Sequence, residues 1–158
     1  SNIIYEFKKR DKNKPLILMG SEHKHLIDYV HESAKEDYEN LASKYWPGAL
    51  TIVIPASAKQ TAHLTSNDQT IGLRIPNSNI AQSLLRETGP LLTSSANISG
   101  FKGSITAEGI ALDFPSIKIL GPIPWGKSSG KASTIIFWKN SGNWKLIREG
   151  EVIVRELY

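Results

Sequence analysis

Short apolar runs and helically spaced apolar residues alternate along the 158-residue chain. Runs rich in β-branched and other apolar residues, most of them bounded by proline, glycine or polar residues, predict strands. They cover residues 16–19, 49–54, 70–75, 90–93, 117–120, 133–138 and 144–148. Helical segments separate most of these runs and the last runs follow one another closely, so the predicted class is α/β with a twisted sheet that mixes parallel and antiparallel pairs.

Apolar residues at helical spacing predict the helices that should cover this sheet. They lie at residues 3–7 as the end of a helix, 22–45 as two helices broken near 33–36, 80–86, and 106–114. Asn77 or Ser78 is suited to cap the third of these regions. Trp46-Pro47-Gly48 predicts a turn ahead of the second strand.

The composition indicates one domain without a membrane span. A chain of 158 residues is long enough for one core and too short to expect two. The longest apolar runs fall well short of the roughly 20 residues that a transmembrane helix needs. Residues 1–10 carry charges where a secretory signal would have an apolar core. The absence of cysteine excludes disulfides and thiolate metal sites and fits a reducing cytoplasm.

The formal net charge of +4 favours anionic partners modestly. Near the N-terminus, basic residues cluster at Lys8, Lys9, Arg10, Lys12 and Lys14. In an extended segment Lys8 and Arg10 would point to the same face. An ammonium group and a guanidinium fork placed together can hold a polyphosphate and stabilise a departing pyrophosphate. The alternative is a pair of solvated surface charges.

Two further features are candidates for ligand binding. Ser95 and Asn97 lie in a loop of small residues whose hydroxyl and amide groups suit an anion or a sugar. The alternative is a polar turn in which these side chains bond to their own backbone. Arg74 is the only charged residue of its predicted strand, and it could meet a carboxylate or phosphate at the end of the sheet or form a structural ion pair.

Other patterns predict no chemistry. The histidines lack the partners of a structural zinc site, so we expect no tightly held metal; they are His23, His25, His31 and His63. The glycine- and serine-rich residues 126–131 lack Walker A spacing and indicate a surface loop. No Ser-His-Asp set can be assigned, and the tryptophans favour packing over base stacking.

A set of motifs occurs in one order over nearly the whole chain. They are Lys-x-Arg at Lys8 and Arg10 with Pro-Leu at 15–16, Trp-Pro-Gly-Ala-Leu-Thr at 46–51, Arg-Ile-Pro at 74–76, Ser-Ala-Asn-Ile-Ser-Gly at 95–100, Ser-Thr at 133–134 and Arg-Glu-Gly at 148–150. This combination resembles the YrdC-like family, whose members include threonylcarbamoyl-AMP synthases.

The resemblance implies an open, twisted α/β sheet with helices on its faces, folded around a basic cavity. It also implies a nucleotidyltransferase that converts L-threonine, bicarbonate and ATP into threonylcarbamoyl-AMP and pyrophosphate. ATP would bind as a substrate together with Mg²⁺, which would help to offset charge on the departing pyrophosphate. A separate transferase would pass the threonylcarbamoyl group to the adenosine just 3′ of the tRNA anticodon, so this protein would bind RNA weakly at most.

Site residues carry over from the resemblance by matched motif position. The catalytic group would be Lys8, Arg10, Ser95 and Asn97. ATP would be bound by Lys8, Arg10, Thr70, Asn97 and Arg148. Threonine would be bound by Arg74, Ser95 and Ser133. No residue is assigned as a metal ligand.

Two features depart from the family pattern. Family members carry a Pro-Thr-x-Thr-x-Tyr-Gly-Leu motif ahead of Lys-x-Arg that helps to build the threonine pocket, and the sequence does not contain it. Met19 occupies a place where some synthases have a histidine. We therefore expect residues 1–158 to form a single YrdC-like domain that is incomplete at its N-terminus. The alternative function is a non-catalytic paralogue that binds RNA or nucleotide.

Overall fold

The computed structural model describes residues 2–9, 11, 16–58, 69–101, 103–104, 106–120 and 129–158. The chain forms two compact units. The loop unit comprises Ser1–Lys14 and Ser94–Lys131, and the sheet unit comprises Pro15–Thr93 and Ala132–Tyr158.

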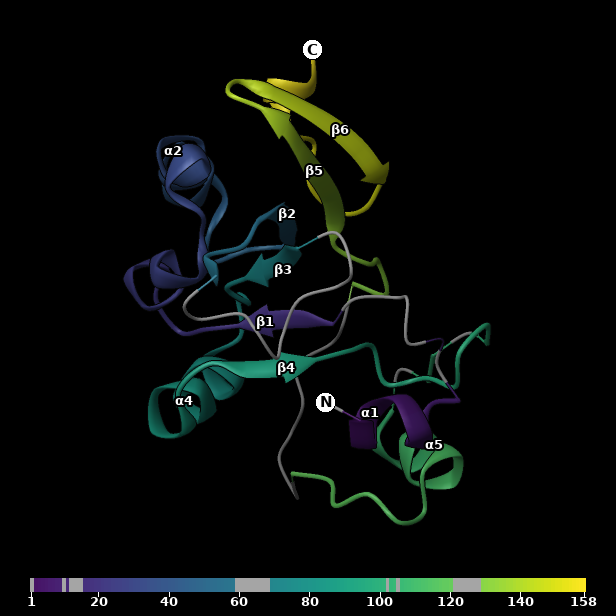
Figure 1. Cartoon of the computed structure of the whole chain (residues 1–158). Coiled ribbons are helices and arrows are strands. Elements are labelled where there is room, and N and C mark those ends of the chain that lie inside the picture. The colour runs from purple at the N-terminus through teal and green to yellow at the C-terminus, as the bar shows by residue number, and fades with distance from the viewer. Residues whose placement is uncertain are drawn as a thin grey trace. The chain divides into compact units, whose positions relative to one another are not determined.

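A six-stranded sheet with the strand order β4-β1-β3-β2-β5-β6 forms the centre of the sheet unit (Figure 1). The strands in chain order are β1 (Ile17–Met19), β2 (Leu50–Pro55), β3 (Thr70–Arg74), β4 (Leu91–Thr93), β5 (Thr134–Asn140) and β6 (Asn143–Arg148). β1 with β3 and β2 with β5 are parallel, and the other neighbours are antiparallel. The mixed sheet predicted from the sequence is confirmed.

Alternate residues of the central strands point into the hydrophobic core on one face of the sheet. Leu50, Ile52 and Ile54 of β2 are completely buried. The antiparallel register places Ile52 beside Leu73 and Ile54 beside Ile71, so the core-facing residues of β2 and β3 form continuous rows. Burial of each such side chain contributes about 2 kcal/mol, which favours this register over a one-residue slip that would expose all of them.

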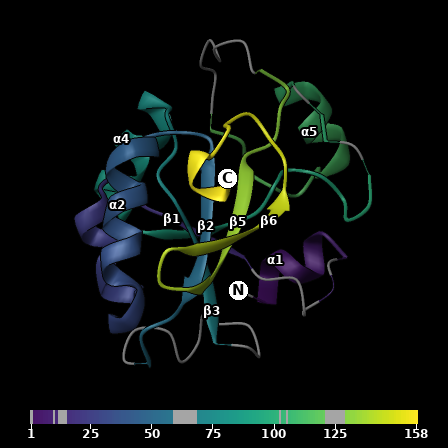
Figure 2. The same ribbon diagram turned by 90° about the horizontal axis from the view of Figure 1, so that it is seen from above.

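Helix α2 (Lys35–Tyr45) lies beside the strands and covers this core (Figure 2). Its buried residues Tyr38, Leu41 and Ala42 follow the i, i+3, i+4 spacing of one helical face. The Tyr38 hydroxyl donates a hydrogen bond to the His23 carbonyl oxygen at 2.8 Å, so the buried phenol keeps a partner. Burial raises the pKa of Tyr38, which therefore stays protonated at neutral pH.

The first of the two helices predicted over residues 22–45 is wrong. Short 3-10 turns replace it, namely η1 (His23–His25), η2 (Ile27–Tyr29) and η3 (Glu32–Ala34). The His31 amide donates to the Pro55 carbonyl oxygen at 2.9 Å. The Ser57 amide donates to the Tyr29 carbonyl oxygen at 2.8 Å. This pairing holds Val30, between Tyr29 and His31, in an extended conformation that no helix can continue through.

Helix α4 (Asn79–Thr88) joins β3 to β4. The Ser78 hydroxyl accepts a hydrogen bond from the Ala81 amide and is therefore one of the two predicted N-caps. Gly89 ends the helix with a φ of 75°, a conformation that residues with a Cβ rarely adopt. Within the described ranges, no helix is long and apolar enough to cross a membrane.

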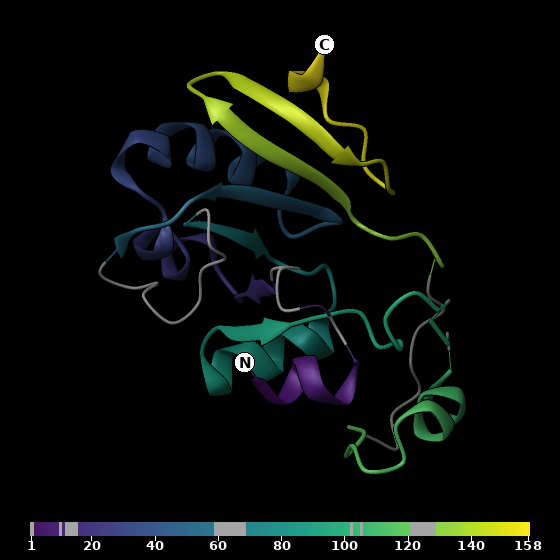
Figure 3. The same cartoon turned by 45° about the vertical axis from the view of Figure 1, so that its right-hand side comes forward.

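The β5–β6 hairpin lies beside α2 (Figure 3), and one carboxylate of this helix anchors it there. Asp37 Oδ2 accepts hydrogen bonds from Trp138 Nε1 at 2.7 Å and from the Gly142 amide at 3.1 Å. Gly142 has a φ of 69°, so the turn of the hairpin needs a residue without a Cβ. The carboxylate therefore fixes both a strand and the turn that follows it.

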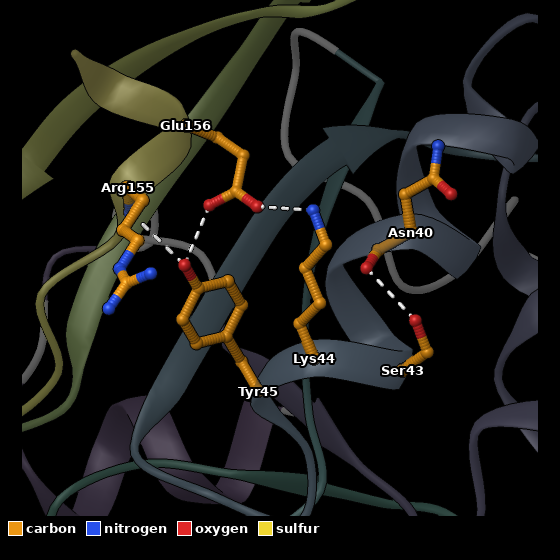
Figure 4. Close-up of polar contacts among 6 residues, drawn as sticks. All are labelled: Asn40, Ser43, Lys44, Tyr45, Arg155 and Glu156. Carbon is orange, nitrogen blue, oxygen red and sulfur yellow. Dashed lines mark hydrogen bonds and ion pairs between the residues drawn. The ribbon is translucent and has the colours of Figure 1, made fainter.

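The C-terminal turn η4 (Arg155–Leu157) is attached to the end of α2 (Figure 4). The Glu156 carboxylate accepts from Lys44 Nζ and from the Tyr45 hydroxyl, each at 2.7 Å. The Tyr45 oxygen in turn accepts from the Arg155 amide at 3.1 Å. Val154, just before the turn, is 1% exposed and belongs to the core.

The loop unit contains α1 (Asn2–Phe7) and α5 (Ala107–Asp113). Thr106 caps α5 through a hydrogen bond from the Gly109 amide at 3.1 Å. The strand predicted over residues 117–120 is wrong. Ile117 instead closes a turn by donating its amide to the Phe114 carbonyl oxygen at 3.0 Å. The described part of the loop unit contains no strand with which this apolar run could pair.

Candidate functional site

Lys8 follows α1, where its amide donates to the Ile4 carbonyl oxygen at 3.2 Å. The side chain is buried, with 4% of its surface exposed. Its ammonium group donates to the Ser95 carbonyl oxygen and lies 3.5 Å from Ser95 Oγ and 3.4 Å from Asn97 Oδ1. The structure thus brings together three of the four residues predicted to form the catalytic group. The fourth, Arg10, lies outside the described residues.

The Ser-Ala-Asn loop is organised by the amide of Asn97. Asn97 Nδ2 donates to the carbonyl oxygens of Ile98 at 3.0 Å and Phe101 at 2.7 Å. These bonds turn Oδ1 toward Ser95, whose hydroxyl donates to it at 2.5 Å. The polar-turn interpretation therefore accounts for Asn97 Nδ2, which bonds to its own loop, whereas Asn97 Oδ1 contacts Lys8.

A second contact ties the same loop to the basic segment. The Ser99 amide donates to the Lys8 carbonyl oxygen at 3.1 Å. Lys8 is thus bonded to this loop through both its backbone and its side chain. Ser95, beside the ammonium group, is solvent-exposed. A fixed positive charge next to an exposed hydroxyl and backbone is suited to an anionic oxygen.

The four predicted residues of the sheet unit lie on one face of the sheet. Thr70 and Arg74 alternate with core residues of β3 and therefore point away from the core. Arg148 pairs with Ile135, which alternates with core-facing Ile136. Ser133 directly precedes Thr134, whose pairing with Leu50 places it toward the core. We call this the polar face, defined by Thr51, Thr70, Arg74, Ser133 and Arg148.

Arg74 is positioned by the turn that precedes β2. Its Nε donates to the Gly48 carbonyl oxygen at 3.1 Å. The Gly48 amide donates to the Ile75 carbonyl oxygen at 2.9 Å, and the Trp46–Pro47 peptide bond is cis. A Cβ on Gly48 would overlap the Tyr45 carbonyl oxygen, so the turn requires glycine.

Burial lowers the pKa of Arg74. The negative charge of Glu151 opposes this shift, and the positive charge of Arg148 adds to it. Two guanidinium groups therefore influence one another across the polar face. An anionic ligand between them would relieve that repulsion.

Ser133 is bonded to two other residues of the polar face. Arg148 donates to its carbonyl oxygen from Nε at 3.0 Å and from Nη2 at 2.8 Å, and Nη2 also lies 3.1 Å from its hydroxyl. Thr51 Oγ1 lies 2.9 Å from Ser133 Oγ. Ser133 and Thr51 are 5% and 1% exposed. This cluster fixes the guanidinium of Arg148 in place.

The sequence prediction missed Thr51. Strand alternation contained a usable signal, because a hydroxyl between core-facing Leu50 and Ile52 has to point to the opposite face. Met19 also lies on the polar face, since its register partner in β3 is Arg74. The β-hydroxyl of Thr51 and the thioether of Met19 are thus additional groups beside the predicted residues.

Neither metal ligands nor the described cavity coincide with the predicted residues. Within the described ranges, no group of three or more His, Asp or Glu residues could hold a metal ion. A cavity of about 500 Å³ in the sheet unit is lined by residues outside the predicted site, namely Asp28, Val30, His31, Glu32, Lys35, Ser57 and Ala58.

The sheet is open and mixed, and two arginines lie on its polar face. The chain also buries a lysine against a Ser-Asn loop. Such cationic groups are suited to anionic ligands. The family model Sua5_yciO_yrdC, described as telomere recombination, matches residues 1–150. The chain belongs to this family.

Relatives and solved structures agree with this assignment. The chain is 33% identical to threonylcarbamoyl-AMP synthase of Bacillus subtilis (strain 168) over 136 residues, covering 84% of this chain and 39% of that protein. It is 34% identical to threonylcarbamoyl-AMP synthase of Yersinia pestis (strain Pestoides F) over 123 residues, covering 75% of this chain and 64% of that protein. The chain therefore spans less than two thirds of the length of these relatives.

The fold is shared with solved structures. P. abyssi Sua5 complexed with L-threonine matches with a TM-score of 0.79 and 32% identity, covering 94% of this chain and 44% of that one. E. coli YciO matches with a TM-score of 0.83 and 23% identity, covering 99% of this chain and 76% of that one. The YrdC-like fold predicted from the sequence is confirmed.

Proposed function

We propose that the chain is the catalytic part of a threonylcarbamoyl-AMP synthase, a nucleotidyltransferase acting on L-threonine, bicarbonate and ATP. The observation that carries the proposal is the 33% identity to the Bacillus subtilis synthase over 84% of the chain. The similarity to a Sua5 structure complexed with L-threonine supports the amino acid as one substrate.

The reaction joins a carbamate to a nucleotide. The amine of threonine and bicarbonate form a carbamate with loss of water. A carbamate oxygen attacks the α-phosphorus of ATP, the bond from this phosphorus to the bridging oxygen breaks, and pyrophosphate leaves. Negative charge grows on the leaving group, so the protein's main task is to position cations and hydrogen-bond donors.

The proposed roles of the individual residues are those of the matched motif positions in the family. Lys8, with Arg10, neutralises the phosphates, and Ser95 and Asn97 hold the ammonium of Lys8 and contact the nucleotide. Thr70 and Arg148 bind ATP from the polar face. Arg74 and Ser133, with Ser95, bind threonine. The buried ammonium with contacts at 3.4 and 3.5 Å supports the role of Lys8, and the mutual influence of the two guanidinium groups of the polar face supports those of Arg74 and Arg148.

Mg²⁺ would enter with the nucleotide and offset charge on its phosphates. The product is a mixed anhydride, which a downstream transferase would use to modify tRNA. The protein would act in the cytoplasm and contact RNA weakly, through its positive charge.

The test is pyrophosphate release from ATP by the purified full-length protein. Release should require both L-threonine and bicarbonate, and mass spectrometry should detect threonylcarbamoyl-AMP. Omission of each substrate in turn is the control. Release that is independent of threonine, or binding of ATP without any product, would refute the synthase and favour a non-catalytic nucleotide-binding protein.

A further inference from the structure

The hydroxyl of Thr51 is buried in the polar face with one partner. It lies 2.9 Å from Ser133 Oγ and is 1% exposed. In the part of the chain that the structure describes, Thr51 Oγ1 makes no second hydrogen bond. Bulk water cannot replace that partner at this level of burial.

The direction of this hydrogen bond follows from the number of protons. A hydroxyl group has one proton to donate and two lone pairs to accept with. If Ser133 donated to Thr51, the Thr51 proton would be left buried without an acceptor, which is unfavourable. If Thr51 donates to Ser133, the proton without a protein acceptor is that of Ser133 instead, and Ser133 is the more exposed of the two residues, at 5% against 1%. The second arrangement is favoured.

The contact with Arg148 is compatible with the same direction. A guanidinium group can only donate, and its Nη2 lies 3.1 Å from Ser133 Oγ. Ser133 Oγ then accepts from both Thr51 and Arg148. Its own proton remains available for a ligand.

We infer that Thr51 is a positioning residue that holds Ser133 as a hydrogen-bond donor toward an anionic oxygen of the ligand. The inference rests on the proposed function and extends it, because it specifies which kind of atom Ser133 recognises. An oxygen acceptor of the ligand satisfies this donor, and the nearby charge of Arg74 favours a carboxylate or phosphate oxygen; an ammonium group of the ligand would face another proton. Arg74 lies next to Thr51 on this face, since Ile52 pairs with Leu73, and it supplies the matching charge.

The test is a double-mutant cycle of Thr51→Val and Ser133→Ala, read by calorimetric titration of the purified protein with L-threonine and, separately, with ATP. Thr51→Val keeps the volume and removes the hydroxyl. We expect it to weaken binding of one of these ligands about tenfold. It should have almost no effect when Ser133 is already alanine. Thr51→Ser, which keeps the hydroxyl, should restore affinity.

A matched control is Thr134→Val. Thr134 is also a buried threonine, and its hydroxyl donates to the Val152 carbonyl oxygen at 2.5 Å, but it faces the core. Its substitution should lower thermal stability and leave both affinities unchanged. A merely structural role for Thr51 would give the same result as Thr134.

The outcomes separate the inference from the proposed function. A coupled loss for threonine assigns the acceptor to the amino acid, and a coupled loss for ATP assigns it to the nucleotide. Additive losses, or no loss with Thr51→Val while the wild type binds both ligands, overturn the inference alone. A wild-type protein that binds neither ligand refutes the proposed function, and the inference with it.

Discussion

Lys8 Nζ lies 3.4 Å from Asn97 Oδ1, although 89 positions separate the two residues in the sequence. The ammonium also donates to the Ser95 carbonyl oxygen. A lysine that is 4% exposed and held by a distant loop is a fixed charge rather than one of several mobile surface lysines. Its neighbour Lys9 is solvent-exposed, which gives a matched comparison within one segment.

Lys8→Gln should weaken ATP binding about tenfold or more, because it removes a charged donor from a site of fixed geometry. Lys9→Gln removes the same charge from an exposed position and should change the affinity by less than about twofold. Titration calorimetry with ATP at constant ionic strength measures both. Equal losses would show that diffuse charge, and not the contact with the Ser-Asn loop, determines nucleotide affinity.

The sequence predicted those features that depend on residues close together in the chain. Apolar runs bounded by proline, glycine or polar residues predicted the six strands of the sheet to within about two residues. The Ser-Ala-Asn motif singled out Ser95 and Asn97, but neither spacing nor charge indicated that Asn97 would divide its amide between its own loop and Lys8. That arrangement depends on a contact 89 positions away.

The failures have a common cause, which is dependence on partners that are distant in the sequence. Residues 27–29 have helical spacing, yet the backbone on both sides of Val30 pairs with the end of β2 and the residues that follow it. Residues 117–120 are apolar, yet a strand requires a neighbour. Thr51 was missed because its role depends on Ser133, which is 82 positions away. Local patterns therefore predict elements better than they predict which side chains meet.

Arg74→Met should weaken L-threonine binding at least about tenfold, because methionine cannot donate to a carboxylate. The free energy of unfolding should change by only about 1 kcal/mol, since loss of the bond to the Gly48 carbonyl is offset by removal of a half-buried charge. Calorimetry and urea unfolding measure the two quantities. Arg74→Lys should also bind poorly, because lysine lacks the planar fork. Normal affinity with a large loss of stability would indicate a structural role instead.

Asp37→Ala should destabilise the sheet unit by about 2 kcal/mol, because it removes the acceptor of Trp138 Nε1 and of the Gly142 amide. Glu36→Ala is the control. Glu36 also lies in the first turn of α2 and is exposed, so both variants lose the same interaction with the helix dipole. Urea unfolding monitored by tryptophan fluorescence gives the difference. Similar losses in the two variants would assign the effect to the helix terminus rather than to the hairpin.

Glu156 should make stability depend on pH in the acidic range. Burial opposes ionisation of Glu156, but the hydrogen bonds from Lys44 and Tyr45 outweigh it and hold its pKa below the ordinary value of 4.5. A carboxyl group whose pKa is lower in the folded state stabilises the fold above the unfolded-state pKa and loses this effect as the pH falls through the folded-state pKa. Wild type should therefore exceed Glu156→Gln in stability by about 1 kcal/mol at pH 7. The difference should shrink as the pH falls below about 4.5.

Urea unfolding of both proteins between neutral and acidic pH measures this difference. Glu32→Gln provides the control, because Glu32 pairs with Lys35 but its side chain is 83% exposed, so solvent screens the pair. Its effect at pH 7 should be smaller than that of Glu156→Gln. Tyr45→Phe should reproduce part of the Glu156→Gln loss, since the hydroxyl joins Glu156 to the Arg155 amide. A Glu156→Gln difference that persists unchanged at acidic pH would show that the carboxylate charge does not hold the C-terminal turn on α2.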